Sequence, residues 1–216
     1  MKILILRHGE TAWNTEARLQ GQKDMELNEH GIRLAQMTAE NMKDVHVDIC
    51  YTSPLKRARK TAELVLKGRN VPIMDDARLM EISFGAYEGL CCSKKNPEVS
   101  PEFMDAFYNH PMQYEAPEGG ETFGQLCDRV KDFIDWLVHQ DELQNKTVLL
   151  SCHGCSSRAL LRVMEGERAP ENFWRGCIPP NLSVSTVYYE NGVFTLTELD
   201  HLYYDRKEWK DTYARR

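Results

Sequence analysis

The sequence predicts an α/β fold in which helices cover both faces of a mostly parallel sheet of about six strands. Three observations predict this class. Short apolar runs of strand length alternate with segments that repeat apolar residues at helical spacing. The length of 216 residues fits one domain with a full core and a small insertion. Hydrophobic residues make up 42% and charged residues 28%, an ordinary composition for a globular domain.

The first strand and the first long helix follow directly from the start of the chain. Residues 1–6 are predicted to form a buried strand, because they contain the apolar run Ile3-Leu4-Ile5. Asn28 is placed to cap a helix. The apolar residues of this helix recur at helical spacing: Ile32, Ala35, Ala39 and Met42.

A second strand and helix follow in the same order. Residues 47–52 are predicted to form the strand, and Ser53-Pro54 is typical of an N-cap followed by a first-turn proline. One face of the helix then carries Leu55, Ala58, Ala62 and Val65. Residues 71–74 predict a short third strand, where Pro72 favours an edge position because proline cannot donate to a strand ladder.

Residues 84–121 break the regular pattern. They contain four prolines, the pair Gly119-Gly120 and several large apolar residues. We expect one domain over residues 1–216, with an insertion around residues 90–120. Its short helices could cover a site like a lid, or form a plain surface insertion, and the sequence favours neither.

The last part of the chain returns to regular elements. Thr122 is predicted to start a long helix, and residues 147–152 form another buried strand that ends at His153-Gly154. A helix with Ala159, Leu160 and Val163 follows. Residues 184–189 and 193–199 flank Asn191-Gly192, which indicates a β-hairpin, and a charged, aromatic tail begins at Asp200.

Charge and cysteine content limit the partners and the compartment. The net charge is −6 and no basic stripe stands out, so we expect no nucleic-acid partner. We see no signal peptide and no apolar run of membrane-spanning length, and therefore expect no membrane partner. Seven cysteines form no obvious disulfide framework. Reduced thiols in the cytoplasm are the simpler expectation.

Three remote segments are predicted to meet in one crevice. His8, the turn at residues 53–57, and His153 each follow the carboxyl end of a predicted strand. Ligands of such sheets bind outside those ends. Arg7 and Arg57 could hold anionic phosphate oxygens, and His8 could attack phosphorus.

Two further residues complete this hypothesis. His153 could donate to a phosphate oxygen, and Glu81 could protonate the leaving group. Each residue also has a structural interpretation. Arg57 lies in the basic run 56–60, which would usually be solvated, Glu81 could be an ordinary exposed carboxylate, and His153 could simply cap a helix.

Six segments, in order, resemble motifs of the histidine phosphatase superfamily, the phosphoglycerate-mutase-like proteins. They are residues 6–14 (LRHGETAWN), 19–22 (LQGQ, followed by Leu27 and Gly31), 53–62 (SPLKRARKTA), 79–89 (LMEISFGAYEG), 117–122 (PEGGET) and 151–154 (SCHG). One such motif would be weak, but six in the same order are strong. The likeness spans most of the chain, from residue 1 to about residue 200.

The resemblance implies a three-layer α/β/α sandwich around a mixed sheet. It implies His8 as the phosphorylated nucleophile and Glu81 as the proton donor, with Arg7, Arg57 and His153 forming the phosphate pocket. We expect Thr11, Asn14, Gln20, Gly21 and Gly154 to bind substrate. No metal and no cofactor are implied.

The likeness has two gaps. Cys155 stands where the family often has glycine or alanine, and it could narrow the pocket. The stretch 90–116, in the region that usually contacts the rest of the substrate, has no counterpart we can assign.

Several functions stay open within and beyond this family. A metal-independent phosphomonoesterase acting on a small phosphorylated metabolite is preferred, because the segment after Glu81 lacks the extra Arg and His that would grip a substrate carboxylate in a mutase. A cofactor-dependent phosphoglycerate mutase and a noncatalytic phosphate-binding module are the alternatives. Cys152 and Cys155 form a Cys-x-x-Cys that would suit redox chemistry, and together with Cys91 and Cys92 they would suit zinc, although Cys-x-x-Cys alone is a weak signal. A homodimer is possible, and residues 184–199 could either extend a sheet edge or pair with a second chain.

Overall fold

The computed structural model describes residues 1–166, 173–175 and 177–208. Its core is one mixed sheet with the order β3-β2-β4-β1-β5-β6. The strands are β1 (Lys2–Arg7), β2 (Ile49–Thr52), β3 (Ile73–Asp75), β4 (Thr147–Cys152), β5 (Ser183–Glu190) and β6 (Val193–Leu202). β3, β2, β4 and β1 run parallel to one another, whereas β5 pairs antiparallel with both β1 and β6. The predicted mixed, mostly parallel sheet is confirmed.

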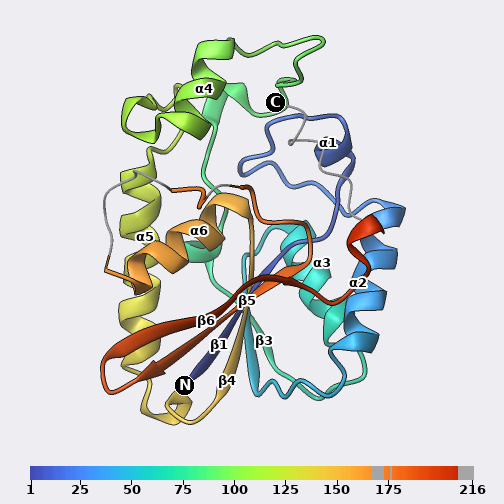
Figure 1. Cartoon of the computed structure of the whole chain (residues 1–216), viewed down its shortest axis with the longest axis vertical. Coiled ribbons are helices and arrows are strands. Elements are labelled where there is room, and N and C mark those ends of the chain that lie inside the picture. The colour runs from blue at the N-terminus through green and yellow to red at the C-terminus, as the bar shows by residue number, and fades with distance from the viewer. Residues whose placement is uncertain (167–172, 176, 209–216) are drawn as a thin grey trace.

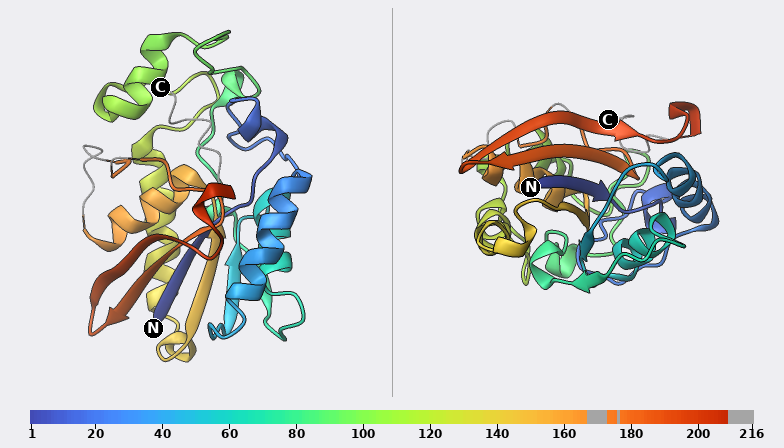
Figure 2. Two further views of the ribbon diagram at one scale, coloured as in Figure 1. Left: turned by 45° about the vertical axis from the view of Figure 1, so that its right-hand side comes forward. Right: turned by 90° about the horizontal axis from the view of Figure 1, so that it is seen from below.

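Helices cover both faces of this sheet, so the three-layer sandwich is confirmed (Figures 1 and 2). α2 (Glu29–Asn41) and α3 (Lys56–Val65) pack on one face, and α5 (Phe123–Val138) and α6 (Gly154–Met164) pack on the other. Side chains of β1 alternate between the two cores: Ile3 and Ile5 join the α5/α6 core, and Leu4 and Leu6 join the α2/α3 core. No helix in the described part of the chain is long and apolar enough to cross a bilayer.

Caps at two helix starts agree with the sequence. The Asn28 side chain accepts from Gly31 N at 2.7 Å, and Thr122 begins α5 with a capping box to Gln125. The predicted start of α3 is wrong by two residues. Leu55, in extended conformation, is its N-cap, and Ser53 still continues the strand ladder through its bond to Ser151 O. The chain must turn before the helix can start.

The edges of the sheet show one agreement and one difference. β3 is an edge strand, as Pro72 predicted. The hairpin turns at Asn191 and Gly192, both in the left-handed region, as expected for a two-residue turn. β6, however, continues to Leu202 instead of ending at residue 199, because a bulge that includes Asp200 (φ 52°) lets the strand resume pairing with β5. Figure 2 shows β6 at the outer edge of the sheet.

Two short helices lie at the end of the molecule toward which the parallel strands point (Figure 1). They are α1 (Ala12–Thr15) and α4 (Pro101–Asn109). α4 begins with Ser100 as N-cap and Pro101 in the first turn, so the irregular segment does contain a helix. Its Phe107 is buried and stacks on Phe123 of α5 at a ring distance of 5.2 Å. The insertion is therefore packed against the body of the domain.

Candidate active site

The predicted convergence at the carboxyl edge of the sheet is confirmed by a cavity that reaches all the relevant segments. Its polar wall is formed by Arg7, His8, Asn14, Gln20, Arg57 and Glu81. The cavity also reaches Gly21, Gly154 and Cys155. His153 lies directly behind His8, with 5.1 Å between the ring centroids. The cavity volume is about 60 Å³, small beside the roughly 300–1,000 Å³ of typical ligand sites.

His8 is held as a neutral imidazole with one nitrogen available. Its Nδ1 lies 2.7 Å from Gly9 O, and because a carbonyl can only accept, Nδ1 carries the hydrogen. The lone pair is then on Nε2. Burial lowers the pKa of His8 well below its ordinary value, and the charges of Arg57 and Arg7 lower it further. A neutral imidazole with a free Nε2 is the form that can act as a nucleophile.

The backbone around His8 is anchored from three directions. His8 N donates to Cys152 O at 2.9 Å, and Asn181 Nδ2 donates to His8 O at 2.9 Å. Gly9 N donates to Thr61 Oγ1 at 2.9 Å. These bonds connect β1 to β4, to the segment before β5, and to α3, and they keep the imidazole in one place.

Arg7 lies beside His8 with one donor unused. Its Nη1 donates to Pro179 O, while its Nε is buried without a partner among the described residues. A buried, unpaired guanidinium N–H is costly unless it meets an acceptor. A phosphate oxygen in the cavity would supply that acceptor.

Arg57 is fully buried, so the solvated-face interpretation is wrong for it. Its Nη1 donates to Lys23 O at 2.7 Å and its Nη2 to Gly21 O at 2.6 Å. Burial lowers its pKa to about 10, so it remains a cation at neutral pH. Its charge therefore faces the cavity while two backbone carbonyls fix its position.

His153 occupies the site but is bonded to protein on both ring nitrogens. Nδ1 accepts from Arg57 Nε at 3.1 Å, and Nε2 lies 2.8 Å from Ser53 Oγ. Burial and the charge of Arg57 lower its pKa well below the ordinary value. It also is the N-cap of α6, so the capping interpretation is correct as well. In this geometry His153 orients Arg57, and donation to phosphate would require Ser53 to give up its bond.

Glu81 is 9% exposed, so it is not an ordinary surface carboxylate. Its Oε1 accepts from Ile82 N at 3.0 Å and Ser156 N at 3.1 Å, and its Oε2 accepts from Cys155 N at 3.1 Å. The carboxyl group thus lies at the N-terminus of α6, held by three backbone N–H groups. It lines the same cavity as His8.

The predicted substrate-binding residues divide into lining and supporting groups. Thr11 is fully buried, and its Oγ1 bonds Gln20 Oε1 at 2.9 Å, which leaves the Gln20 amide nitrogen as its donor toward a ligand. Asn14 Oδ1 accepts from Thr11 N at 3.1 Å. Gly21 has φ +51°, a conformation that favours glycine, and its carbonyl supports Arg57. Thr11 therefore supports the site from behind its lining.

Sequence reasoning missed several supporting residues. Thr61, Asn181 and Pro179 hold the backbone or side chains of Gly9, His8 and Arg7. Of these, Asn181 had the clearest signal, a polar residue after two prolines and two residues before a buried strand. The aromatic wall of the cavity, which includes Phe107 and Trp174, has no signal beyond its apolar composition.

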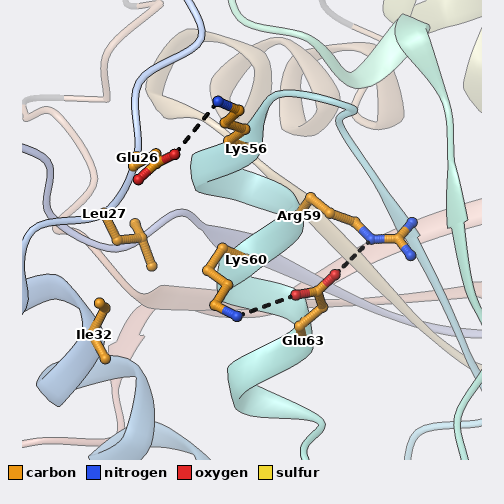
Figure 3. Close-up of a pocket in the computed structure, with 7 residues that line it drawn as sticks. All are labelled: Glu26, Leu27, Ile32, Lys56, Arg59, Lys60 and Glu63. Carbon is orange, nitrogen blue, oxygen red and sulfur yellow. Dashed lines mark hydrogen bonds and ion pairs between the residues drawn. The ribbon is translucent and has the colours of Figure 1, made fainter.

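A second cavity of about 360 Å³ lies between α3 and the segment before α2 (Figure 3). Its charged residues pair with one another, Lys56 with Glu26 at 3.4 Å and Lys60 and Arg59 with Glu63 at 3.6 and 3.2 Å. None of the candidate catalytic residues lines it. The larger cavity is therefore not the candidate active site.

The cysteines show no sign of a shared site. All seven are free thiols, and burial raises the pKa of Cys152 to about 12 and that of Cys155 well above its ordinary value. A high pKa disfavours the thiolate needed for redox chemistry. In the described part of the chain, no group of three His, Cys, Asp or Glu residues could hold a metal ion.

Comparison with known proteins identifies relatives of this chain. The model of a family described as "Histidine phosphatase superfamily (branch 1)" matches residues 3–201. "Phosphoserine phosphatase 1" of Hydrogenobacter thermophilus is 30% identical over 191 residues, covering 88% of this chain and 87% of that protein. A "Metal-independent phosphoserine phosphatase" of Arabidopsis thaliana is 35% identical over 171 residues, covering 78% and 71%. The solved structure of Bacillus stearothermophilus YhfR superposes with a TM-score of 0.83 at 31% identity, covering 92% and 96%.

Proposed function

Because the chain belongs to the histidine phosphatase superfamily, we propose that it hydrolyses a small phosphorylated metabolite without a metal ion, through a phosphohistidine on His8. The superfamily and the named phosphatase relatives make the chain a phosphomonoester hydrolase. One observation carries the finer proposal. The neutral imidazole of His8, with Nδ1 bonded to Gly9 O, has its free Nε2 beside the guanidinium groups of Arg7 and Arg57.

The proposed reaction has two steps. His8 Nε2 attacks phosphorus, the nitrogen–phosphorus bond forms, and the ester oxygen leaves with a proton from Glu81. Water then attacks the phosphohistidine and gives its proton to Glu81, and phosphate leaves. Arg7 and Arg57 balance the negative charge of the phosphoryl oxygens in both steps, the contribution that matters most in phosphoryl transfer.

The test compares phosphate release from a panel of small phosphomonoesters, with EDTA present, for the wild type, His8→Ala and His46→Ala. We expect release by the wild type and by His46→Ala, because His46 is an exposed histidine paired with Asp48. We expect none by His8→Ala. Normal turnover by His8→Ala, or activity that EDTA removes and added metal restores, would contradict the mechanism. Acid-labile phosphate trapped on the wild type alone would identify the intermediate.

The mutase and the binding module remain distinguishable alternatives. Transfer between hydroxyls of a phosphoglycerate, dependent on a bisphosphate cofactor, would identify a mutase. Phosphate binding without turnover of any ester would identify a binding module. The residues after Glu81 favour hydrolysis, since Ile82 and Ser83 occupy the places of the Arg and His expected of a mutase.

We also propose a cytoplasmic enzyme that binds no nucleic acid and forms a homodimer. The net charge of −6 supports the absence of a nucleic-acid partner. The outer position of β6 in the sheet offers an edge for pairing with a second copy. Sedimentation analysis tests the dimer, and a monomer at micromolar concentration would contradict it.

A further inference from the structure

The cavity is lined by apolar side chains away from the proposed phosphate-binding groups. Its remaining wall is formed by Leu19, Phe84, Phe107, Tyr108, Trp174 and Ile178. The aromatic rings contact one another, with centroid distances of 5.1 Å for Phe84–Phe107, 5.3 Å for Phe107–Trp174 and 5.2 Å for Tyr108–Trp174. Trp174 Nε1 already donates to Phe107 O at 2.9 Å. The wall therefore presents mainly apolar surface to whatever is esterified to the phosphate.

One further cation reaches this cavity, and its charge is already matched. Arg18 Nε pairs with Glu16 at 2.9 Å, and its Nη1 pairs with Glu98 at 3.1 Å and donates to Gly89 O at 2.7 Å. The other cations of the described lining, Arg7 and Arg57, stand at the phosphate end. Among the described lining residues, none is left to neutralise a second anionic group on the substrate.

These observations identify the alcohol that the site can accept. A carboxylate next to the ester would be buried against aromatic rings without a cation, and burial of an unpaired charge is strongly unfavourable. An apolar alcohol gains free energy from the same wall. We propose, on the basis of the function above, that the substrates are phosphomonoesters of small, uncharged, apolar alcohols, and that esters carrying a carboxylate are disfavoured. This separates the chain from its relatives named phosphoserine phosphatases.

The first experiment measures kcat/KM for n-propyl phosphate and O-phosphoserine with the full chain. Both are esters of a primary alcohol with three carbons, so the carboxylate and amine are the main difference. We expect n-propyl phosphate to be preferred by about 10- to 100-fold, the range of discrimination an apolar pocket can supply. A preference for O-phosphoserine would overturn the inference and leave the proposed function intact. If the protein hydrolyses neither of these esters and no other phosphomonoester, the proposed function itself is overturned.

A second experiment introduces the missing charge. Ile178 is half-buried in the cavity wall, and Ile178→Arg would place a guanidinium there. We expect Ile178→Arg to shift the ratio of kcat/KM toward O-phosphoserine by about tenfold. Ile178→Gln is the matched control, because it removes the same apolar contact without adding charge. An equal shift in both variants would overturn the inference, and thermal unfolding of each variant shows that it is folded.

Discussion

Arg129 and Glu121 form a two-bond ion pair that fixes the Glu81 loop (residues 79–89) from outside the cavity. Arg129 Nε and Nη2 donate to the Glu121 carboxylate at 3.0 and 2.8 Å. The same guanidinium donates to Arg78 O and Met80 O at 2.9 and 3.0 Å and to Glu81 O at 3.3 Å. Glu121 in turn accepts from Ser83 N at 3.0 Å. The pair thus holds the backbone on both sides of the proposed proton donor.

We predict that Arg129→Met affects esters according to their leaving group. Loosening Glu81 weakens protonation of the departing oxygen, which matters for an alkoxide and little for an activated phenolate. We expect kcat/KM for n-propyl phosphate to fall by about tenfold or more, out of the roughly 10²- to 10⁴-fold that a general acid contributes. For p-nitrophenyl phosphate, we expect a loss below about threefold. Steady-state kinetics with the two esters measure this difference.

Lys131→Met is the control for that prediction, because Lys131 lies on the same helix and pairs with Asp135 near the surface. Lys131→Met should leave kcat/KM unchanged for both n-propyl phosphate and p-nitrophenyl phosphate. Glu81→Gln should show the same asymmetry as Arg129→Met. Equal losses on both esters in Arg129→Met would mean that Arg129 stabilises the fold without positioning Glu81.

A pair of buried threonines predicts opposite responses to the same substitution. Thr61 Oγ1 accepts from Gly9 N at 2.9 Å and donates to Arg57 O at 2.6 Å, whereas Thr38 Oγ1 has no partner among the described residues. Thr61→Val should lower the free energy of unfolding by about 1–3 kcal/mol, because the Gly9 N–H is left unsatisfied. Thr38→Val should be neutral or stabilising. Urea unfolding measures the free energy of unfolding of both variants. Equal changes in Thr61→Val and Thr38→Val would contradict the role of Thr61.

Two glycines with positive φ separate backbone strain from steric contact. A Cβ on Gly21 would lie 2.1 Å from Glu88 Oε1, whereas a Cβ on Gly68 would meet nothing within 4 Å. Gly68→Ala should cost only the left-handed strain of about 1–2 kcal/mol. Gly21→Ala should cost more and also lower kcat/KM, since Gly21 O holds Arg57. Urea unfolding and activity are measured for both, and unchanged activity in a folded Gly21→Ala would argue against that support.

Stability should fall as the pH drops below about 6.5, the ordinary pKa of histidine. His8 and His153 both have a lowered pKa in the folded state because of burial and nearby arginines. As the pH falls, the two histidines take up protons in the unfolded chain but not in the folded chain. The folded state therefore keeps its full stability above the unfolded-state pKa and loses stability below it. Each histidine contributes at most about 1.4 kcal/mol per pH unit in this window.

Urea unfolding between pH 7 and pH 5.5 measures this slope. His153→Asn should remove the contribution of one histidine, whatever its effect on stability at pH 7. A wild-type stability that does not change across this range would contradict the buried, neutral state of the two histidines.

The sequence was sufficient for the parts of the site that depend on strand order. His8 and His153 each follow a buried apolar run, and the carboxyl ends of parallel strands meet by geometry. Caps such as Asn28 and Thr122 are local, and local chemistry is visible in the sequence. Ser53 was misjudged as the cap because its backbone still pairs with Ser151, a contact 98 residues away along the chain.

The remaining site depends on long-range packing that no pattern encodes. Arg129 has the helical position of a solvated arginine, and only the fold shows that it reaches the carbonyls of Arg78, Met80 and Glu81. Phe107 and Trp174 are apolar residues of an irregular segment and a late loop, equally suited to a core or a cavity wall. Their place beside the proposed phosphate-binding residues follows from tertiary contacts alone.

The central position of β1 has a consequence for how the chain acquires activity. Its neighbours in the sheet are β4 and β5, and the carbonyls of Arg7 and His8 bond Leu182 and Asn181. During synthesis, the strand that carries the nucleophile must wait on the order of ten seconds for these partners to emerge. Such non-local pairing also slows folding. Vanadate or phosphate should bind only the completed site. Either ligand should therefore leave the early steps of folding unchanged, but it should stabilise the folded protein against unfolding.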